Sequence, residues 1–427
     1  MSAPELILRD LSPGLLALPW DLPLADWSPA EVPLRDIAVG PSRHLVRFVE
    51  TDGRRWALKE LPHRIARREF TVLRTMETEG LPAVRPAGVV YQSESTKPDT
   101  AILVTHYLEG SWQYRRLFMR LPPNRPAHRA RLFDAMASLL VELHRHGIFW
   151  GDCSLANTLF SRDGQTLQAF MVDAETSEIH PQLSEGQRRF DLDILVENVA
   201  GGMIDLAERL ERPPEIHPQL MAEAFAIPER YYALWDALHA APTFSFGDRY
   251  RVEGKIRELN DLGFAVEEVA LQPAGDAPGK LTLQVGVGDR RFHARRLQEL
   301  TGLEVGEGQA RVLLGDLQAH HAWLARRNGR DPSDAETAAS WLEVCLRPGT
   351  ARAHKAVGGV GSPVQAYCDL LEVRWILSER EGADIGDARA LAALASRAPA
   401  DSAARAAVVE PSTGWFTVPD QDPADPS

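Results

Sequence analysis

The chain has few cysteines, no long apolar run and a deficit of basic residues. Its three cysteines, Cys153, Cys345 and Cys368, are scattered and odd in number, so neither a disulfide framework nor a zinc site is expected. No apolar stretch is long enough to span a bilayer, and the N-terminus lacks a signal pattern of basic and then apolar residues. The 47 basic and 60 acidic residues give a net charge of −13. This charge argues against nucleic acid or an anionic membrane surface as the main partner, and we expect a cytoplasmic protein.

Residues 143–175 contain three oxygen-bearing side chains at short spacings. Asp152 follows an expected helix, Asn157 comes five residues later, and Asp173 follows a short hairpin. Carboxylate and amide oxygens are the ligands that Mg²⁺ requires. Phosphoryl transfer needs one carboxylate to orient an attacking hydroxyl and oxygen ligands for the metal that bridges the phosphates. The three side chains are therefore candidates for this chemistry if they converge.

The expected hairpin is what brings them together. Strands are predicted over residues 157–160 and 169–172, with a turn around Asp163 and Gly164. If these strands pair, the asparagine and the second aspartate lie at neighbouring strand ends, facing the loop that carries the first aspartate.

This stretch resembles the catalytic loop and metal-binding strand of the protein-kinase-like superfamily, whose protein-kinase members read H-R-D-x-x-x-x-N and then D-F-G. Here the motifs read WGDCSLAN (150–157) and DAE (173–175). The residues Gly151 and Glu175 are closer to lipopolysaccharide (Kdo) kinases and aminoglycoside phosphotransferases. A glycine in the arginine position removes the cation that usually pairs with a phosphorylated activation loop, so a phosphorylation switch is not expected.

The resemblance implies a role for each of these residues. It makes Asp152 the catalytic carboxylate, Asn157 and Asp173 the metal ligands, and ATP and Mg²⁺ the cofactors. Upstream, an alternating pattern with a turn at residues 52–53 predicts a hairpin. Its second strand, WALK (56–59), resembles the V-A-I-K strand.

That similarity implies that Lys59 is a catalytic and phosphate-binding residue. Gly40 would lie in the phosphate-covering loop, although this loop has a single glycine where protein kinases use several. The strand expected over residues 101–110 corresponds to the hinge. There the backbone groups of His106, Tyr107 and Leu108 would bind adenine.

A helix is expected over residues 64–79, with Ala66, Phe70 and Leu73 forming an apolar stripe. Glu69 lies inside this stripe. A carboxylate on a buried face needs a cationic partner, and Lys59 is the expected one, which would give Glu69 a catalytic positioning role. The alternative is that Glu69 lies at the edge of the stripe and pairs with one of the neighbouring arginines.

Two further residue assignments concern the catalytic loop. The amphipathic helix expected over residues 131–144 leads into this loop, and His144 is expected to be buried and structural. In a later helix, Asp191 or Asp193 could brace the loop by bonding its backbone. The resemblance does not choose between these two aspartates.

A domain boundary is expected near residues 241–247, where the helical pattern breaks. Beyond it we expect a helix, two strands and then helices over residues 309–326, 334–346, 364–380 and 388–396, the second with a capping box from Ser333 to Glu336. A basic cluster is read as a solvated helix face, with an anion site as the alternative. It comprises Arg290, Arg291, His293, Arg295 and Arg296.

The expected fold class is α+β: a bilobal protein-kinase-like fold followed by a separate C-terminal α+β domain rich in helices. The order resembles a bacterial family in which a lipopolysaccharide-kinase-like domain precedes domain of unknown function 4032. The expected parts are an irregular N-terminal arm (1–35), an N-lobe (36–105), a C-lobe (106–242), the C-terminal domain (243–397) and a disordered tail (398–427).

These patterns predict an ATP- and Mg²⁺-dependent phosphotransferase acting on a hydroxyl of a small molecule or glycan. A protein partner could bind through the C-terminal domain. The alternative is a pseudokinase-type nucleotide-binding scaffold, because Trp150 replaces the usual histidine and Glu175 replaces the usual glycine. The acceptor itself has no legible motif.

Overall fold

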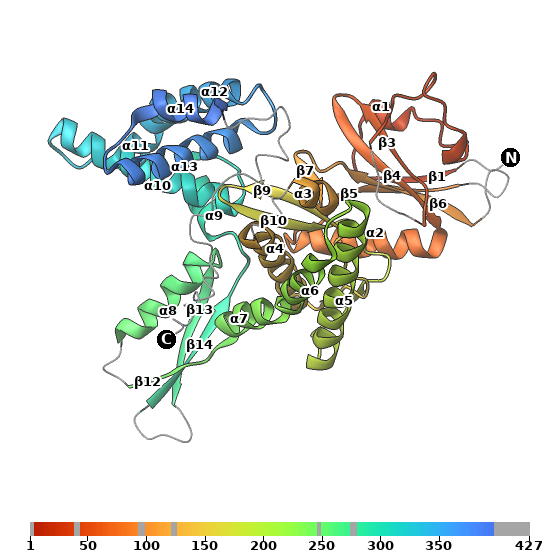
Figure 1. The fold of residues 1–427 in the computed structure, drawn as a ribbon, viewed down its shortest axis with the longest axis horizontal. Helices are drawn as coiled ribbons and strands as arrows, with labels where there is room; N and C mark the ends of the chain where they lie inside the picture. Colours follow the sequence, from red (N-terminus) through yellow and green to blue (C-terminus); the bar gives the residue numbers. More distant parts are fainter. Residues whose placement is uncertain are drawn as a thin grey trace. The chain divides into compact units, whose positions relative to one another are not determined.

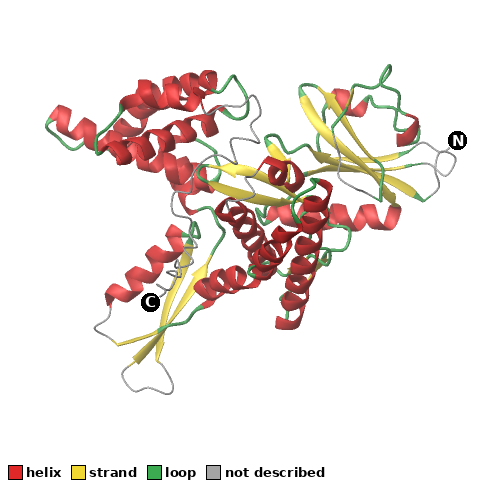
Figure 2. Cartoon of the chain, in the orientation of Figure 1, coloured by secondary structure: helices red, strands yellow, loops and turns green. Residues whose placement is uncertain are grey.

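The computed structural model describes residues 4–37, 43–92, 99–120, 126–245, 249–273 and 280–396. The chain forms two compact units, each discontinuous in sequence (Figures 1 and 2). The first comprises Met1–Arg116, Ala135–Ser161 and Ala169–Pro228, and the second Leu117–Asp134, Arg162–Gln168 and Glu229–Ser427. The expected tail and Gly40 lie outside the described residues.

A six-stranded antiparallel sheet forms the N-terminal part of the first unit, in the order β1-β5-β6-β4-β3-β2. Strand β4 alternates in burial over most of its length because successive side chains point to opposite faces of the sheet. On β4, Trp56 and Leu58 point to one face and Lys59 to the other. The strands are β1 (Glu5–Leu8), β2 (Leu34–Arg35), β3 (Val46–Thr51), β4 (Arg54–Pro62), β5 (Pro86–Tyr91) and β6 (Thr100–His106).

The N-terminal arm covers the face of this sheet to which Trp56 and Leu58 point. Trp20 and Trp27 are buried against a cluster that includes Trp56 and Ile102. The arm was expected to be irregular, and this is wrong at its two ends. Its residues form β1, which pairs with β5, and β2, which pairs with β3, so the arm supplies both edge strands. A short helix, α1 (Pro13–Leu16), and a 3₁₀ turn (Leu24–Asp26) lie between them.

Helix α2 (His63–Thr78) packs against β4, β5 and β6. It begins directly after β4, where Pro62 fixes the backbone of the N-cap, and its buried stripe contains Ala66, Phe70 and Leu73. The predicted helix and its apolar stripe are thus confirmed. Glu69 belongs to this buried face.

The rest of the first unit is mainly helical, with three small strand pairs near the loop of residues 150–157, and residues 117–134 and 162–168 of the elements named below belong to the second unit. Helix α4 (Pro126–Arg145) leads into β8 (Ile148–Phe149), which pairs with β11 (Glu178–Ile179). The hairpin of β9 (Thr158–Asp163) and β10 (Thr166–Met171) lies beside β7 (Ser111–Gln113). The expected hairpin is confirmed and its strands are longer than predicted. Around them lie α3 (Tyr114–Arg120), α5 (Glu185–Arg209), a 3₁₀ turn (Pro214–Ile216) and α6 (His217–Phe225).

The second unit contains a three-stranded sheet and a set of helices, visible in green to blue in Figure 1. The sheet has the order β12-β14-β13, and α8 packs against β13. Its strands are β12 (Thr243–Ser245), β13 (Val266–Pro273) and β14 (Lys280–Val287), and the helices beside them in the chain are α7 (Ile227–His239) and α8 (Arg249–Asp261). The segment expected only to break the helical pattern therefore also contributes a strand.

The remaining helices share one apolar core in which Leu313, Trp341 and Leu370 are buried. They are α9 (Phe292–Thr301), α10 (Glu307–Asn328), α11 (Asp334–Trp341), a π-helical turn (Leu342–Leu346), α12 (Arg347–Ala356), α13 (Pro363–Glu381) and α14 (Gly386–Ser396). Helix α12 was not predicted, and the helix expected over residues 334–346 changes to π geometry at Leu342. The expected α+β class is confirmed. No described helix is both long enough and apolar enough to cross a membrane.

The basic cluster at α9 has carboxylate partners of its own. Arg295 lies 2.7 Å from Asp289, and the half-exposed Arg296 lies 3.6 Å from Asp334. His293 lies 2.6 Å from Glu307. Because Arg295 and Arg296 are paired with carboxylates on the surface of the helix, the arrangement favours the solvated helix face over an anion site.

Candidate active site

Lys59 lies at the centre of the candidate site. Its Nζ is 3.1 Å from Glu69 Oε2 and 2.8 Å from Asp173 Oδ2. The expected Lys59–Glu69 ion pair is therefore present, and the alternative pairing with a neighbouring arginine is wrong. One ammonium therefore joins strand β4 and the adjoining helix α2 to the segment after β10, which lies more than a hundred residues further along the chain.

Burial makes this ion pair sensitive to its surroundings. Glu69 is fully buried. Its burial raises the pKa of its carboxyl to about 7, although the ammonium of Lys59 opposes that shift. Burial alone would lower the pKa of Lys59, but the charges of Glu69 and Asp173 outweigh it and raise this pKa, so the ammonium stays charged. Glu69 Oε1 also accepts a hydrogen bond from the Ala174 amide at 3.3 Å, which ties α2 to the segment of the second aspartate.

Asp152 and Asn157 form the other half of the site. The amide nitrogen Nδ2 of Asn157 donates to Asp152 Oδ2 at 3.0 Å and to the Asp152 carbonyl at 3.1 Å. The amide of Val172 donates to the Asn157 carbonyl at 3.1 Å. Asn157 and Asp173 are therefore at neighbouring strand ends, as predicted from the hairpin. Side-chain contacts thus join Glu69, Lys59 and Asp173 in one group and Asn157 and Asp152 in another, and the backbone bond from Val172 to Asn157 places the two groups at neighbouring strand ends.

Asp191 braces the catalytic loop, which resolves the choice between the two aspartates. Its carboxylate accepts hydrogen bonds from the amides of Trp150 and Gly151, each at 2.8 Å, and lies 3.1 Å from Nε2 of His144. All of Asp191 and nearly all of His144 are buried. Asp193 is exposed on the same helix and has the wrong helical phase for this contact. The expected structural role of His144 is confirmed.

The departures from the protein-kinase motifs have local structural reasons. Gly151 has φ +80°, and a Cβ there would lie 3.1 Å from the Thr176 carbonyl, so an arginine at this position would be strained. Trp150 is fully buried, and its carbonyl accepts hydrogen bonds from the hydroxyls of Thr176 and Ser177. The loop is thus fastened to the segment after the second aspartate by neutral hydrogen bonds, without a phosphate.

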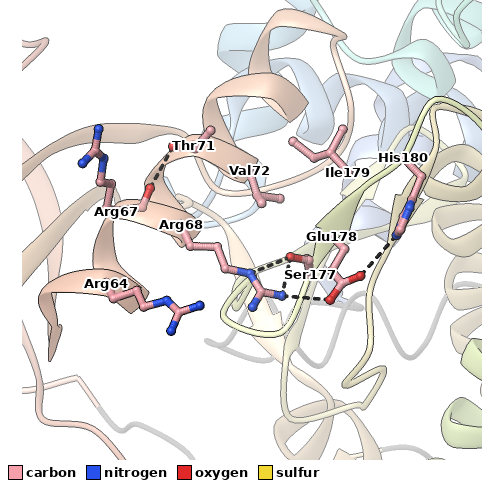
Figure 3. A pocket seen from close by; sticks show the side chains of 9 residues that line it. All are labelled: Arg64, Arg67, Arg68, Thr71, Val72, Ser177, Glu178, Ile179 and His180. Carbon is pink, nitrogen blue, oxygen red and sulfur yellow. Dashed lines mark hydrogen bonds and ion pairs between the residues drawn. The ribbon is translucent and has the colours of Figure 1, made fainter.

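Figure 3 shows a second fastening, in which Arg68 of α2 reaches the same segment. Its guanidinium donates to the carbonyls of Thr176 and Ser177 at 2.8 and 2.9 Å and lies 3.6 Å from Glu178. These groups border an open groove of about 570 Å³ whose lining includes Arg64 and Arg67. Because Arg68 adjoins Glu69, its contacts hold α2 in the position that the Lys59–Glu69 pair requires.

Glu175 has a partner that the sequence did not indicate. Its carboxylate lies 3.0 Å from His44 Nε2, in the segment after β2, and its amide donates to Asp173 Oδ1 at 3.0 Å. The pairing joins residues 131 positions apart, so no local pattern could have revealed it. Glu175 has negative φ, and the conformation therefore has no need of the usual glycine.

The expected hinge residues lie at the end of β6 and just after it. The amides of His106 and Tyr107 already donate to the carbonyls of Arg85 and Arg55, at 2.9 and 3.0 Å. The imidazole of His106 packs on Trp56, on the face covered by the arm. These two amides already have backbone partners, and the adenine-binding roles of His106, Tyr107 and Leu108 stay predictions.

The donor set suits a magnesium ion. Asn157 turns its Nδ2 toward Asp152, so its Oδ1 faces away from that carboxylate, and Asp173 supplies carboxylate oxygens from the neighbouring strand end. Among the described residues there is no cluster of three or more His, Cys, Asp or Glu side chains that could hold a metal. Two protein oxygens are compatible with Mg²⁺, which usually keeps several waters and binds substrate phosphates.

The arrangement is that of the protein-kinase-like superfamily: a lysine–glutamate pair between strand and helix, an aspartate and asparagine in a loop, and a second aspartate after a hairpin. Family models agree with this class. Residues 50–209 match the Lipopolysaccharide kinase (Kdo/WaaP) family, and residues 233–397 match the domain of unknown function DUF4032. The expected resemblance is therefore confirmed for each of these two regions.

Two solved structures are similar to this chain. One is WaaP in complex with acyl carrier protein, with 18% sequence identity and a TM-score of 0.34, covering 54% of this chain and 99% of that chain. The other is the crystal structure of BubR1 kinase domain, with 14% identity and a TM-score of 0.27, covering 36% of this chain and 49% of that chain. Among curated proteins, none matches the chain.

Proposed function

We propose that this protein is an ATP- and Mg²⁺-dependent phosphotransferase that acts on a hydroxyl of a small molecule or glycan. The observation that carries the proposal is the position of the Lys59 ammonium between Glu69 and Asp173, at 3.1 and 2.8 Å. A buried carboxylate held against a lysine, beside oxygen ligands for a metal, is the arrangement that positions and neutralises nucleotide phosphates.

Each residue then has one task. Lys59 binds phosphate oxygens, and Glu69 holds its ammonium in place. Asn157 and Asp173 would hold Mg²⁺, which would supply positive charge against the nucleotide phosphates. One oxygen of Asp152 accepts the hydrogen bond from Asn157. Its second oxygen orients the acceptor hydroxyl and takes its proton.

The match of residues 50–209 to a lipopolysaccharide kinase family supports a sugar hydroxyl as the acceptor. The test is a screen of metabolite and glycan extracts for new phosphorylated species, using ATP labelled on its γ-phosphate. The wild-type chain should produce a labelled species that depends on Mg²⁺, and Asp152→Asn should not. Label transfer by Asp152→Asn at the wild-type rate would overturn the role of Asp152.

A nucleotide-binding scaffold is the second candidate. It is favoured by the replacement of the usual histidine and glycine by Trp150 and Glu175. Against it, Trp150 contributes its backbone to the loop and Glu175 pairs with His44, so neither residue removes a charged group that the reaction needs. A thermal-shift titration separates the two. Stabilisation by Mg-ATP with no phosphoryl transfer to any extract favours the scaffold.

A further inference from the structure

The turn of the β9–β10 hairpin is held by the C-terminal region in a way that the reaction residues do not explain. This turn, Arg162–Gln168, clusters with Glu229–Ser427 in the second unit. The hairpin is also the element that carries both proposed metal ligands: Asn157 directly precedes β9, and Asp173 follows β10 by two residues.

Asp163 caps a helix that lies 145 residues further along the chain. Its Oδ2 accepts from the Gly308 amide at 2.8 Å and its Oδ1 from the Gln309 amide at 2.9 Å. These amides open α10, whose own N-cap residue, Gly306, has no side chain to bond them. Asp163 therefore does for α10 what a serine or aspartate N-cap normally does from within the helix.

The next residue of the turn is held through its backbone. The Gly164 amide donates to Gln365 Oε1 and the Gly164 carbonyl accepts from Gln365 Nε2, both at 2.9 Å. Gln365, on α13, thus both accepts a hydrogen bond from and donates one to the backbone of the same turn residue. Because one side chain bonds both the amide and the carbonyl of Gly164, it fixes the orientation of the turn relative to α13 as well as the distance between them.

Buried charges complete the contact. Arg162 Nη1 lies 2.8 Å from Asp369 Oδ1, and its Nη2 lies 3.6 Å from Glu372 Oε2. The side chains of all three are no more than 7% exposed. Buried ion pairs seldom add much net stability, because desolvation offsets their attraction, but a broken pair is costly. A contact built in this way therefore selects one position for the turn.

The backbones approach closely enough to require glycine on both sides. A Cβ on Gly308 would lie 2.1 Å from the Asp163 carbonyl oxygen, and a Cβ on Gly164 would lie 2.4 Å from the Gly308 carbonyl oxygen. Neither neighbour is the flexible end of a side chain. The turn and the start of α10 thus interlock, and one methyl group is enough to separate them.

We propose that the DUF4032 region is a positioning domain for the metal site: by fixing the β9–β10 turn, it sets the places of Asn157 and Asp173 through the two paired strands. This inference rests on the proposed function. Arg162 follows Asn157 by five positions along one extended strand, so the fixed turn lies about 17 Å from the proposed metal ligand. Asp163, Gln365 and Arg162 are positioning residues, since they act through the hairpin.

The test compares two single-methyl additions to one helix in the full chain. Gly308→Ala wedges the turn away from α10, whereas Gly315→Ala, in the same helix, meets nothing within 4 Å. Binding of a non-hydrolysable ATP analogue is measured by calorimetry as a function of Mg²⁺ concentration. Gly308→Ala should raise the Mg²⁺ requirement about tenfold, the low end for residues that orient metal ligands. Gly315→Ala should not change it.

A second variant and a second readout guard against simple unfolding. Asp163→Asn keeps the volume but replaces a carboxylate oxygen by an amide group facing two backbone N–H donors, and should also raise the Mg²⁺ requirement. Asp316→Asn, which weakens the hydrogen bonds to Trp341 and Tyr367 but touches no group of the turn directly, should lower the melting temperature without this rise. Hydrogen exchange at the amides of β9 and β10 should quicken in Gly308→Ala and Asp163→Asn and stay unchanged in the other two.

The outcomes separate the inference from the proposed function. If the wild-type chain needs Mg²⁺ to bind the analogue and both turn variants match it, the positioning role is overturned and the phosphotransferase proposal stands. If Asp316→Asn raises the Mg²⁺ requirement as much as the turn variants do, the effect is general destabilisation and the inference fails. If the wild-type chain binds no analogue at any Mg²⁺ concentration, both proposals fail.

Discussion

The two regions with family matches use polar side chains in different ways. In residues 50–209, charged groups converge from distant elements on one point, as Lys59 does with Glu69 and Asp173. In residues 233–397, they tie helices to one another, as Asp316 does by accepting hydrogen bonds from Trp341 at 2.7 Å and Tyr367 at 2.9 Å. The comparison teaches that buried polarity alone does not mark a reaction site. Convergence on groups that can hold a ligand is the better guide.

The largest effect on activity is expected from removing the Asp152 carboxylate, which is proposed to take the proton of the acceptor hydroxyl. Asp152→Asn should lower turnover by about 10²–10⁴-fold while Mg-ATP still binds, since the proposed role of Asp152 is toward the acceptor and not the nucleotide. Steady-state label transfer and calorimetric Mg-ATP binding measure the two effects. Turnover within a factor of two of the wild type would remove Asp152 from the reaction.

The next largest effect is expected at the metal ligand that Lys59 also contacts. Asp173→Asn should weaken Mg²⁺-dependent nucleotide binding at least about tenfold, because it removes a carboxylate ligand and half of the partners of Lys59. Nucleotide binding without Mg²⁺ is the internal control and should change much less. An equal loss with and without the metal would mean that Asp173 serves Lys59 alone.

A pH series tests the buried carboxylate in the first region. Glu69 has a pKa of about 7 in the folded chain against an ordinary value of 4.5, because burial disfavours its charge. Between these pH values the unfolded chain releases the proton and the folded chain keeps it, so this group's contribution to stability falls as pH rises.

Glu69→Gln should therefore gain stability relative to the wild type between pH 5 and 7.5, by on the order of 1–3 kcal/mol, and then level off. Melting temperatures of both proteins over this range measure the change. The variant should nevertheless bind Mg-ATP more weakly at pH 8, since a neutral amide no longer holds the Lys59 ammonium. A constant difference in stability across the series would contradict the raised pKa.

The smallest effect on activity is expected in the second region. Asp316→Asn weakens two hydrogen bonds inside the helical core and should lower stability by about 1–3 kcal/mol. Label transfer at a temperature where the variant is folded should stay at the wild-type rate. A loss of transfer comparable to that of Asp173→Asn would show that the two regions do not differ as described.

Sequence alone predicts the parts of the site that depend on local periodicity. The Lys59 strand, the stripe containing Glu69 and the hairpin that brings Asn157 beside Asp173 each follow from side-chain spacing within one or two adjoining elements. The choice of Asp191 over Asp193 needed the phase of α5 relative to the catalytic loop, which tertiary packing sets. Gly40 lies outside the described residues.

Contacts between distant segments left no readable pattern. The pairing of His44 with Glu175 and the capping of α10 by Asp163 join polar residues whose neighbours are equally polar. Helix α12 does have a sequence signal at its start, because Pro348 lies in its first turn, where proline is favoured. The strand β12 has three residues, too few for an alternating pattern to be recognised.

The central claim is that five side chains, from Lys59 to Asp173, form one magnesium–nucleotide site. Calorimetric titration of ATP into the wild-type chain and Lys59→Met, each with and without Mg²⁺, tests it most directly. The account predicts binding by the wild type that requires Mg²⁺, and a loss of at least about tenfold in Lys59→Met, whose side chain keeps its length but not its charge. Equal binding by both proteins, or no binding by the wild type, would contradict it.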